Sequence, residues 1–363
     1  MIQTYLIRVD LKKIPIFETM RRPYLIPFVP FYSLGTRLRN ALFDRGVLKS
    51  IRFETPCLVV GNLSAGGTGK TPHTEFLLGL FREKKCGVIS RGYGRKSKGF
   101  FWVDADGLAE TYGDEPLQIK RRFPDVPVAV CEDRVLAVPE FIGTYPDTEL
   151  LIFDDAYQHR YLDAHCRIVL TEYSDLFTRD SLLPAGNLRE AKKEAARADV
   201  IIVTKCPAQL DKQQQDLIEA EIRNYHQGPI FFSSFKPEDP VFPGEKVSGD
   251  FKNAAVMVFS AIANGSRWAD PYMGQFKEKV GELCYPDHHR FTQRDIDLLR
   301  KKWKEFGEPL ILTTEKDWMR LMKFAPQLSD LPMLYFPIRV NLLHDSKSFK
   351  GHIESTLYSH SIE

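Results

Sequence analysis

The stretch VVGNLSAGGTGKTPHTEF, residues 59–76, decides the fold class of this 363-residue chain. An apolar run leads into a glycine-rich turn, which carries Gly69, Lys70 and Thr71 in succession before a helical pattern begins. Glycines let a backbone wrap closely around an anion, and the amides at a helix start point toward it. Because strand, loop and helix follow in this order, the stretch predicts a loop that binds the phosphates of a nucleotide.

The loop matches the P-loop pattern G-x-x-x-x-G-K-[ST] with one departure, since its first position is Ser64 rather than glycine. Lys70 is expected to neutralise the β- and γ-phosphates, and the Thr71 hydroxyl is expected to bind Mg²⁺. The expected ligand is therefore a purine triphosphate with Mg²⁺. The residues expected to contact the nucleotide are Ser64, Ala65, Gly66, Gly67, Thr68, Gly69, Lys70 and Thr71.

Short apolar runs alternate with helical patterns around this loop. The runs lie at residues 57–60, 86–90, 126–131, 150–153, 167–170 and 200–204. Strands separated by helices predict an α/β fold, in which a mostly parallel sheet carries helices on both faces as in P-loop NTPases.

The pattern loosens after residue 206, where a polar helix and a proline-rich segment follow. Further strands are predicted at residues 254–263, 309–313 and 333–340, and they would build a smaller C-terminal α/β domain. The predicted division is an N-terminal segment, a P-loop core and a smaller domain that closes over the cleft, at residues 1–50, 51–206 and 207–363.

Composition excludes several classes of protein. A net charge of +2 provides no basic block that could neutralise many nucleic-acid phosphates, so no nucleic acid partner is expected. The six cysteines form no C-x-x-C pair and no zinc-like cluster, which favours a reducing cytoplasm. No signal peptide is expected, and no window approaches the roughly 20 apolar residues of a spanning helix. If such a protein meets a membrane, it lies on the surface.

Residues 20–49 could make that contact. Residues 1–50 hold nine Lys or Arg against three Asp or Glu, so the basic charge is concentrated there. Three prolines forbid a regular helix at first, and an apolar stripe at helical spacing then follows, with three arginines lying off it. The stripe predicts either a helix in a lipid headgroup layer or a helix packed on the main domain, and the two are not exclusive. The stripe is Phe31, Leu34, Leu38, Ala41 and Leu42, and the arginines are Arg37, Arg39 and Arg45.

Two acidic pairs are candidates for metal and proton chemistry. Asp154 and Asp155 end the apolar run at residues 150–153, where a P-loop protein holds its second metal carboxylate, and Asp154 is the first choice for Mg²⁺. Asp114 and Glu115 lie in a turn before a helix. They fit either a general base for phosphoryl transfer or a favourable acidic helix start, and the spacing leaves both open.

Two further stretches carry charge near predicted strand ends. ISRGYGRKSKG, residues 89–99, places Arg91, Tyr93 and Arg95 among glycines, which suits either an anionic substrate group or a solvated basic turn. CYPDHHRFT, residues 284–292, gathers Asp287 to Arg290 in the predicted second domain. It fits either a surface turn or a residue that reaches the cleft to tune a base.

Taken in order, these motifs resemble the tetraacyldisaccharide 4'-kinase family, the lipid A kinases of Gram-negative bacteria. The strings are VGNLSAGGTGKTP, SRGYGR, GDEP, EDR, DDAYQHR, LPAGNLRE, VTK, PDHHRF and TTEKD. The ordered set is specific, because other P-loop ATPases share only the first string and the aspartate pair. In this family the first P-loop position is usually not glycine, which accounts for Ser64. Ala191 departs from the family's proline, and residues 1–17 have no family counterpart.

The resemblance implies ATP-dependent phosphorylation of the 4'-hydroxyl of tetraacyldisaccharide 1-phosphate, which gives lipid IVA. It implies ATP and Mg²⁺ as cofactors and a peripheral monomer at the cytoplasmic face of the inner membrane. It assigns the hydroxyl-orienting carboxylate to Asp114 and its partner to His288. Metal-side carboxylates would be Glu115 and Asp154 with Asp155, and the nucleotide side would include Arg189 and Glu190. The substrate-binding residues would be Asn62, Arg91, Tyr93, Arg95, Arg134, Gln158 and His159.

Two other functions compete with this interpretation. A regulatory P-loop ATPase would bind a membrane and a protein partner without phosphorylating a lipid. A GTPase is less well supported, because neither TKCP at residues 204–207 nor TEKD at residues 314–317 forms the guanine signature N-K-x-D.

Overall fold

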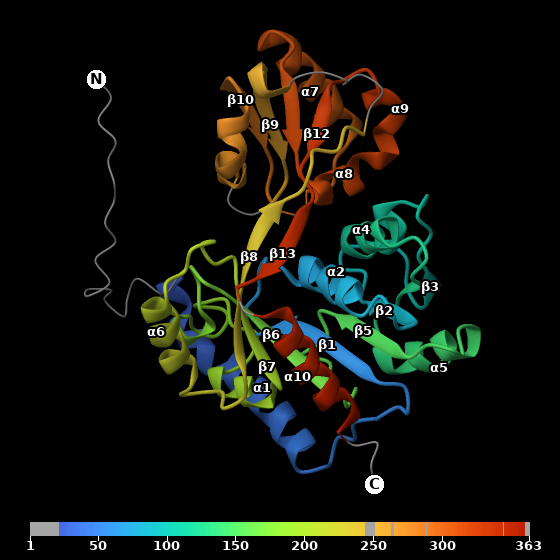
Figure 1. Cartoon of the computed structure of the whole chain (residues 1–363), viewed down its shortest axis with the longest axis vertical. Coiled ribbons are helices and arrows are strands. Elements are labelled where there is room, and N and C mark those ends of the chain that lie inside the picture. The colour runs from blue at the N-terminus through green and yellow to red at the C-terminus, as the bar shows by residue number, and fades with distance from the viewer. Residues whose placement is uncertain (1–21, 244–250, 263–264, 288, 344, 360–363) are drawn as a thin grey trace.

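A computed structural model describes residues 22–243, 251–262, 265–287, 289–343 and 345–359, so the predicted extension at residues 1–17 lies outside the described residues. Two β-sheets, each with its own helices, follow one another along the long axis of the molecule (Figure 1). The helices and strands of the larger one surround the glycine loop.

Within the described residues, the larger sheet has nine strands in the order β13-β8-β7-β6-β1-β5-β2-β4-β3. Neighbouring strands run parallel except at the two edges, where β13 and β3 run antiparallel to β8 and β4. Strands β1, β2, β5 and β7 are buried along their whole length, which explains why their sequences are largely continuous apolar runs. The strands are β1 (Cys57–Asn62), β2 (Cys86–Ser90), β3 (Phe101–Trp102), β4 (Val128–Val130), β5 (Leu150–Asp154), β6 (Cys166–Glu172), β7 (Val200–Thr204), β8 (Ile230–Pro237) and β13 (Ile338–Leu342).

Helices cover both faces of this sheet. Helices α2 (Lys70–Leu80), α4 (Asp114–Arg122) and α10 (Ser346–Tyr358) pack apolar side chains against one face. Helices α5 (Arg134–Thr144) and α6 (Lys212–Ile222) pack against the other. The predicted α/β fold with a mostly parallel sheet is therefore confirmed, and the six strands predicted between residues 57 and 204 are all present.

The smaller sheet has the strand order β10-β9-β11-β12, and all its neighbouring strands are parallel. Its strands are β9 (Ala255–Ser260), β10 (Glu278–Cys284), β11 (Leu310–Thr313) and β12 (Met333–Tyr335). Its helices are η4 (Phe251–Asn253), η5 (Arg267–Gln275), α7 (Gln293–Glu305), α8 (Glu315–Leu321), η6 (Met322–Phe324) and α9 (Ala325–Leu328). We call residues 251–335 the second domain.

The antiparallel pair β8 and β13 connects the two sheets (Figure 1). The single strand predicted at residues 333–340 is therefore wrong: it is two strands, β12 and β13, which belong to different sheets. Pro337 lies between them and has no N–H to donate to a sheet ladder. The predicted boundary near residue 206 stays a prediction, but strand membership favours crossings after β8 and before β13, and we propose these as the domain limits.

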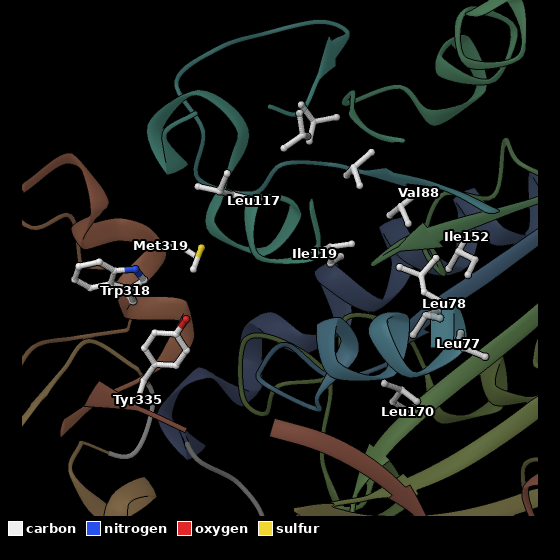
Figure 2. Close-up of a cluster of buried hydrophobic side chains, with 14 of the residues drawn as sticks. Leu77, Leu78, Val88, Leu117, Ile119, Ile152, Leu170, Trp318, Met319 and Tyr335 are labelled. Atoms are coloured by element: carbon white, nitrogen blue, oxygen red, sulfur yellow. The ribbon is translucent and has the colours of Figure 1, made fainter. Parts of the chain in front are cut away.

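The hydrophobic core continues from the larger sheet into the second domain (Figure 2). Leu77 of α2 and Leu117 of α4 belong to the same buried cluster as Met319 of α8. Since apolar contact favours burial without directional demands, this continuity holds α8 against α4. The second domain is thus packed onto the helices that border the glycine loop.

Helix α1 (Val29–Asp44) buries Ser33, Asn40 and Phe43 rather than its apolar stripe. Of the stripe, Phe31, Leu34 and Leu38 are 76%, 67% and 58% exposed. The alternative in which the whole stripe packs on the main domain is therefore wrong, because the face that meets the protein is the one with Ser33, Asn40 and Phe43. None of the described helices is long and apolar enough to cross a bilayer.

Candidate functional site

The glycine loop, residues 63–69, joins the carboxyl end of β1 to the start of α2. Gly69 has a φ of +89°, and a Cβ there would lie 2.5 Å from Cζ of Phe235, so only glycine fits. Asn62 Nδ2 donates to Thr68 Oγ1 at 3.0 Å, and this bond connects the two ends of the loop. No side chain among the described residues caps α2, so its first amides are left for a ligand.

A second segment braces the loop from the side. The amide of Ala65 donates to the carbonyl of Asn187 at 2.7 Å, and the amide of Arg189 donates to the carbonyl of Leu63 at 2.7 Å. The Arg189 guanidinium contacts both carboxylate oxygens of Asp155 at 3.1 and 3.2 Å. The predicted nucleotide-side residue Arg189 therefore lies beside the loop and a predicted metal-side carboxylate.

Asp154 lies beneath the loop because β5 runs parallel to β1, with Val60 and Asp154 in register. Its side chain is fully buried, and Oδ1 accepts a hydrogen bond from Thr74 at 3.3 Å, while Oδ2 is buried and has no hydrogen-bond partner among the described residues. Burial, together with the nearby carboxylates of Glu115 and Asp155, raises the pKa of Asp154 to about 7. A buried carboxylate oxygen without a donor, close to two other carboxylates, fits a divalent cation.

The pKa of Asp155 is shifted in the opposite direction to that of Asp154. Burial alone would raise its pKa, but Lys70 at 3.7 Å and Arg189 at 3.1 Å outweigh burial and hold the pKa below its usual value. The backbone φ of +50° at Asp155 is uncommon for a residue with a side chain, and it turns the chain sharply after β5. Lys70 thus has Asp155 as an anionic partner beside the glycine loop.

The acidic turn, Asp114 and Glu115, begins α4 and meets the second domain. Asp114 Oδ1 accepts from the amide of Glu115 at 3.0 Å, and Oδ2 accepts from Arg320 Nε at 2.7 Å and contacts Arg320 Nη2 at 2.6 Å. Glu115 Oε1 accepts from Lys316 Nζ at 2.9 Å. Both cations belong to α8, so this helix rests directly on the acidic turn.

One cavity of about 510 Å³ joins these parts. Its walls include Lys70 of the glycine loop, Glu115 of the acidic turn and Lys316 of the second domain. Other predicted site residues on its walls are Ala65, Gly66, Gly67, Gly69, Thr71, Tyr93, Asp155 and Arg189. The glycine loop and the acidic turn therefore share a cleft, with the second domain as its far wall.

Other predicted residues lie around this cleft without lining it. Ser64 and Thr68 are buried within the loop. Asp114 lines a neighbouring cavity of about 70 Å³, and Tyr93 borders both cavities. Glu190 is buried. Its carboxylate accepts hydrogen bonds from Asn40 Nδ2 at 3.2 Å and from Arg197 Nη2 at 2.7 Å, so it connects α1 to the segment that contacts the glycine loop, residues 187–190. His288 lies outside the described residues.

Two of the predicted substrate-binding residues, Arg91 and Arg134, form a cationic group with Arg39 of α1 around His159. Burial and then Arg134 lower the pKa of His159 to about 4, and Arg39 and Arg91 lower it further, whereas Asp133 opposes this shift. Arg134 donates to the carbonyl of Asp155 at 2.8 Å, which connects this group to the metal-side carboxylates. Cations that lower one another's pKa are close together, and such a group attracts an anion.

Gln158 and Arg95, two further members of that predicted set, also have structural partners. Gln158 Nε2 donates to the carbonyl of Asn62 at 2.8 Å, at the end of β1. Arg95 differs from the expectation of a residue open to a substrate, because its side chain is only 2% exposed and pairs with Glu132 at 2.8 Å. Its guanidinium also donates to the carbonyl of Gly99 at 2.7 Å, so it holds its own glycine-rich turn together.

Sequence reasoning assigned no role to Lys316 or Arg320. A signal existed in TTEKD, residues 313–317, because it follows a predicted strand and precedes a helix. Spacing of four residues then places Lys316 and Arg320 on one helix face. What the sequence could not show is that this face meets the acidic turn, about 200 residues earlier in the chain.

Comparisons with known proteins identify the family. The family model for LpxK, tetraacyldisaccharide-1-P 4'-kinase, matches residues 21–358. The tetraacyldisaccharide 4'-kinase of Flavobacterium johnsoniae is 38% identical over 332 residues, covering 90% of this chain and 95% of that protein. The corresponding protein of Parabacteroides distasonis is 39% identical over 364 residues, covering 93% and 96%.

A solved structure is similar over nearly the whole chain. The crystal structure of LpxK from Aquifex aeolicus in complex with ATP has a TM-score of 0.72 and 30% sequence identity, and the match covers 93% of this chain and 100% of that one. The resemblance stated from the motifs is therefore confirmed. This chain belongs to the tetraacyldisaccharide-1-P 4'-kinase family.

Proposed function

We propose that this chain transfers the γ-phosphoryl group of ATP to the 4'-hydroxyl of tetraacyldisaccharide 1-phosphate. The observation that carries the proposal is the shared cleft, which has Lys70 and the glycine loop on one wall and Glu115 of the acidic turn on another. Relatives named tetraacyldisaccharide 4'-kinase and the LpxK structure in complex with ATP support both substrates. A regulatory ATPase has no comparable support.

The nucleotide phosphates would bind at the start of α2. The loop amides and the Lys70 ammonium supply positive potential there, and Arg189 adds a further cation beside Asp155. Asp155 keeps Lys70 and Arg189 close to the loop before the nucleotide binds. Its anionic charge therefore positions two phosphate-binding cations.

The residues present fit Mg²⁺, because Asp154 has a buried oxygen without a partner and lies near two more carboxylates. Thr71, Glu115, Asp154 and Asp155 are the residues that would hold it. A bound Mg²⁺ would neutralise charge on the β- and γ-phosphate oxygens.

Asp114 would orient the sugar hydroxyl and accept its proton. The transition state of phosphoryl transfer is loose, so alignment of the hydroxyl matters more than strong basicity. The ion pair with Arg320 fixes the Asp114 carboxylate at the edge of the cleft. His288 would be its partner from the second domain.

Helix α1 would hold the enzyme on the cytoplasmic face of the inner membrane as a peripheral protein. Phe31, Leu34 and Leu38 are exposed on one side, while Tyr32 on the other donates to the carbonyl of Arg189 at 2.9 Å. Arg39 donates to the carbonyl of Gln158 at 2.6 Å, so α1 lies against the cationic group proposed for the anionic acceptor. An acylated acceptor could then keep its chains in lipid.

The membrane role has a matched test. Leu34 of α1 and Leu136 of α5 are 67% and 70% exposed. We expect Leu34→Asp to weaken binding to anionic vesicles about tenfold, since one inserted leucine contributes roughly 1.5–3 kcal/mol, and Leu136→Asp to leave it unchanged. Equal binding by both variants and the wild type in a sedimentation assay would clear α1 of this role.

The activity itself is tested with γ-labelled ATP and the acylated disaccharide 1-phosphate. We expect label in the organic extract, and none when the 4'-hydroxyl of the acceptor is already phosphorylated. Recovery of label only as free phosphate, with the acceptor and membranes present, would favour a regulatory ATPase instead.

A further inference from the structure

Helix α8 follows β11 at the carboxyl end of the smaller sheet and carries two cations toward the first domain. Arg320 contacts Asp114, and Lys316 contacts Glu115. Neither cation has a role in the proposed reaction so far, other than the fixing of Asp114. Their position raises the question of what a pair of positive charges does beside a phosphoryl-transfer cleft.

Arg320 is anchored from several directions. Beyond Asp114, it donates to the carbonyl of Ala261 at 2.9 Å and to Asp317 Oδ1 at 3.1 Å. Asp317 in turn accepts from the amide of Ala261 at 3.1 Å and from Thr314 Oγ1 at 2.8 Å. This network fixes α8 relative to the acidic turn, so the position of Lys316 one helical turn earlier is fixed as well.

Lys316 differs from Arg320 because it lines the large cavity, together with Lys70. Its side chain is 24% exposed, and Nζ lies 2.9 Å from Glu115 Oε1 and 3.9 Å from Asp114 Oδ2. Two carboxylates of the acidic turn therefore face the Lys316 ammonium at the wall of the cavity. The ammonium has three donors, so a bond to Glu115 leaves two for a ligand.

We propose that Lys316 is a catalytic cation, supplied by the second domain, that contacts the phosphoryl group in transit between ATP and the sugar. This inference rests on the proposed function and adds a residue to it. The phosphoryl must pass between the glycine loop and the acidic turn, and Lys316 lines the cavity that joins them. The bond from phosphorus to ADP breaks as the bond to the sugar oxygen forms, and the hydroxyl proton passes to Asp114. Lys316 keeps its proton throughout and stabilises charge on the equatorial oxygens.

A purely structural salt bridge is the competing explanation, and the chain offers a control for it. Lys323 of η6 also crosses to the first domain, where it pairs with Glu110 at 2.6 Å, and its side chain is likewise 24% exposed. It lines the small cavity, not the one with the glycine loop. Lys323 and Lys316 therefore make similar ion pairs across the same contact, with access to different cavities.

The test compares Lys316→Gln and Lys316→Arg with Lys323→Gln in the full-length protein. We expect Lys316→Gln to lower kcat by about 10²-fold or more, Lys316→Arg to recover part of the loss, and Lys323→Gln to stay near the wild type. Affinity for ADP should hardly change, whereas affinity for ADP with aluminium fluoride, which mimics the phosphoryl in transit, should fall only in Lys316→Gln. Equal kcat in Lys316→Gln and Lys323→Gln would overturn the proposal.

A second measurement needs no variant. Acetic anhydride labelling of the wild type, followed by mass spectrometry, should show Lys316 protected by ADP with aluminium fluoride but not by ADP, and Lys323 unchanged by either. Labelling of Lys316 that ignores the fluoride complex would contradict the inference. Both measurements with aluminium fluoride probe Lys316 in the absence of the lipid acceptor, so they test the inference even if the wild type transfers no phosphate to lipid. A wild type that transfers no phosphate to lipid would refute the proposed function, not the role of Lys316.

Discussion

Helices α2 and α8 make an instructive pair, because each follows a strand of a parallel sheet and each carries a lysine in its first turn. Lys70 is the first residue of α2, and Lys316 is the second residue of α8. Before α2 the chain makes a seven-residue glycine loop, whereas before α8 only Thr314 separates strand from helix. Both lysines line the same cavity.

The two helix starts are nevertheless built differently. No described side chain caps α2, so its amides are available to an anion. The side chain of Thr314 caps α8 by accepting from the amide of Asp317 at 3.0 Å, so one of the first amides of that helix is already bonded. The wall with the glycine loop can thus bind phosphate through uncapped backbone amides and Lys70, whereas the wall with α8 presents Lys316 beside a capped helix start.

Removing the cation from the first wall should have the largest effect. Lys70→Ala leaves the loop amides in place but removes the charge on the β- and γ-phosphates, so we expect kcat/KM to fall about 10³-fold. Among the described residues, the Lys70 side chain makes one ion pair, with Asp155 at 3.7 Å, and the protein should therefore still fold. Steady-state kinetics with a parallel thermal melt checks this. A kcat/KM within a few fold of the wild type would contradict the claim that Lys70 binds the nucleotide phosphates.

Distorting the loop itself should come next. Gly69→Ala places a Cβ 2.5 Å from the Phe235 ring at a φ of +89°, so we expect the loop to shift and ADP to bind about tenfold to 100-fold more weakly. Gly79→Ala is the control, since its Cβ meets nothing within 4 Å and α2 should gain about 1 kcal/mol. Titration calorimetry measures the ADP affinity of both variants. Unchanged ADP affinity in Gly69→Ala would mean that the loop backbone is not the phosphate site.

A buried acidic cluster connects the two helices and predicts pH-dependent stability. Glu75 of α2 lies 3.1 Å from Arg122, which also contacts Glu238 and lies 3.9 Å from Glu315 of α8. Burial, and then Glu315, raise the pKa of Glu75 from 4.5 to about 8. The folded state therefore keeps a proton that the unfolded state releases between these values. The free energy of unfolding should fall by about 1.4 kcal/mol per pH unit across that window as pH rises.

Glu75→Gln removes that titration while keeping a group that can accept from Gln118. We expect the variant to gain stability relative to the wild type as pH rises, with the difference greatest above pH 8. Glu83→Gln is the control, because the exposed Glu83 pairs with Lys350 and its pKa is lowered rather than raised. Urea unfolding between pH 5 and 9 measures the effect. Parallel curves for Glu75→Gln and the wild type would rule it out.

The smallest expected effect concerns the cap of α8. Thr314→Ala removes the side-chain oxygen that accepts from the Asp317 amide, so the free energy of unfolding should fall by about 1 kcal/mol. Thr314→Ser keeps the hydroxyl and should recover most of it. Denaturant titration distinguishes them. Equal stability of the alanine and serine variants would show that the cap contributes nothing to this wall.

The sequence predicted the first wall far better than the second. Glycines at fixed spacing between an apolar run and a helix indicate an anion site by themselves, and Asp154 could be placed because it ends a neighbouring apolar run. The contact of Arg320 with Asp114 joins residues 206 apart, and no local pattern reports it. The apolar stripe of α1 predicted a helix, but the burial of Ser33, Asn40 and Phe43 in the structure is what reveals which face meets the protein. The run at residues 333–340 concealed a crossing between sheets, since Pro337 was its only break.

Hydrogen exchange with a nonhydrolysable ATP analogue tests most directly whether the two walls share one ligand. We predict slower exchange in peptides that cover the glycine loop, residues 63–71, and also in peptides that cover the start of α8, residues 313–321, with ADP protecting mainly the first. Protection confined to the glycine loop with either nucleotide would contradict the account.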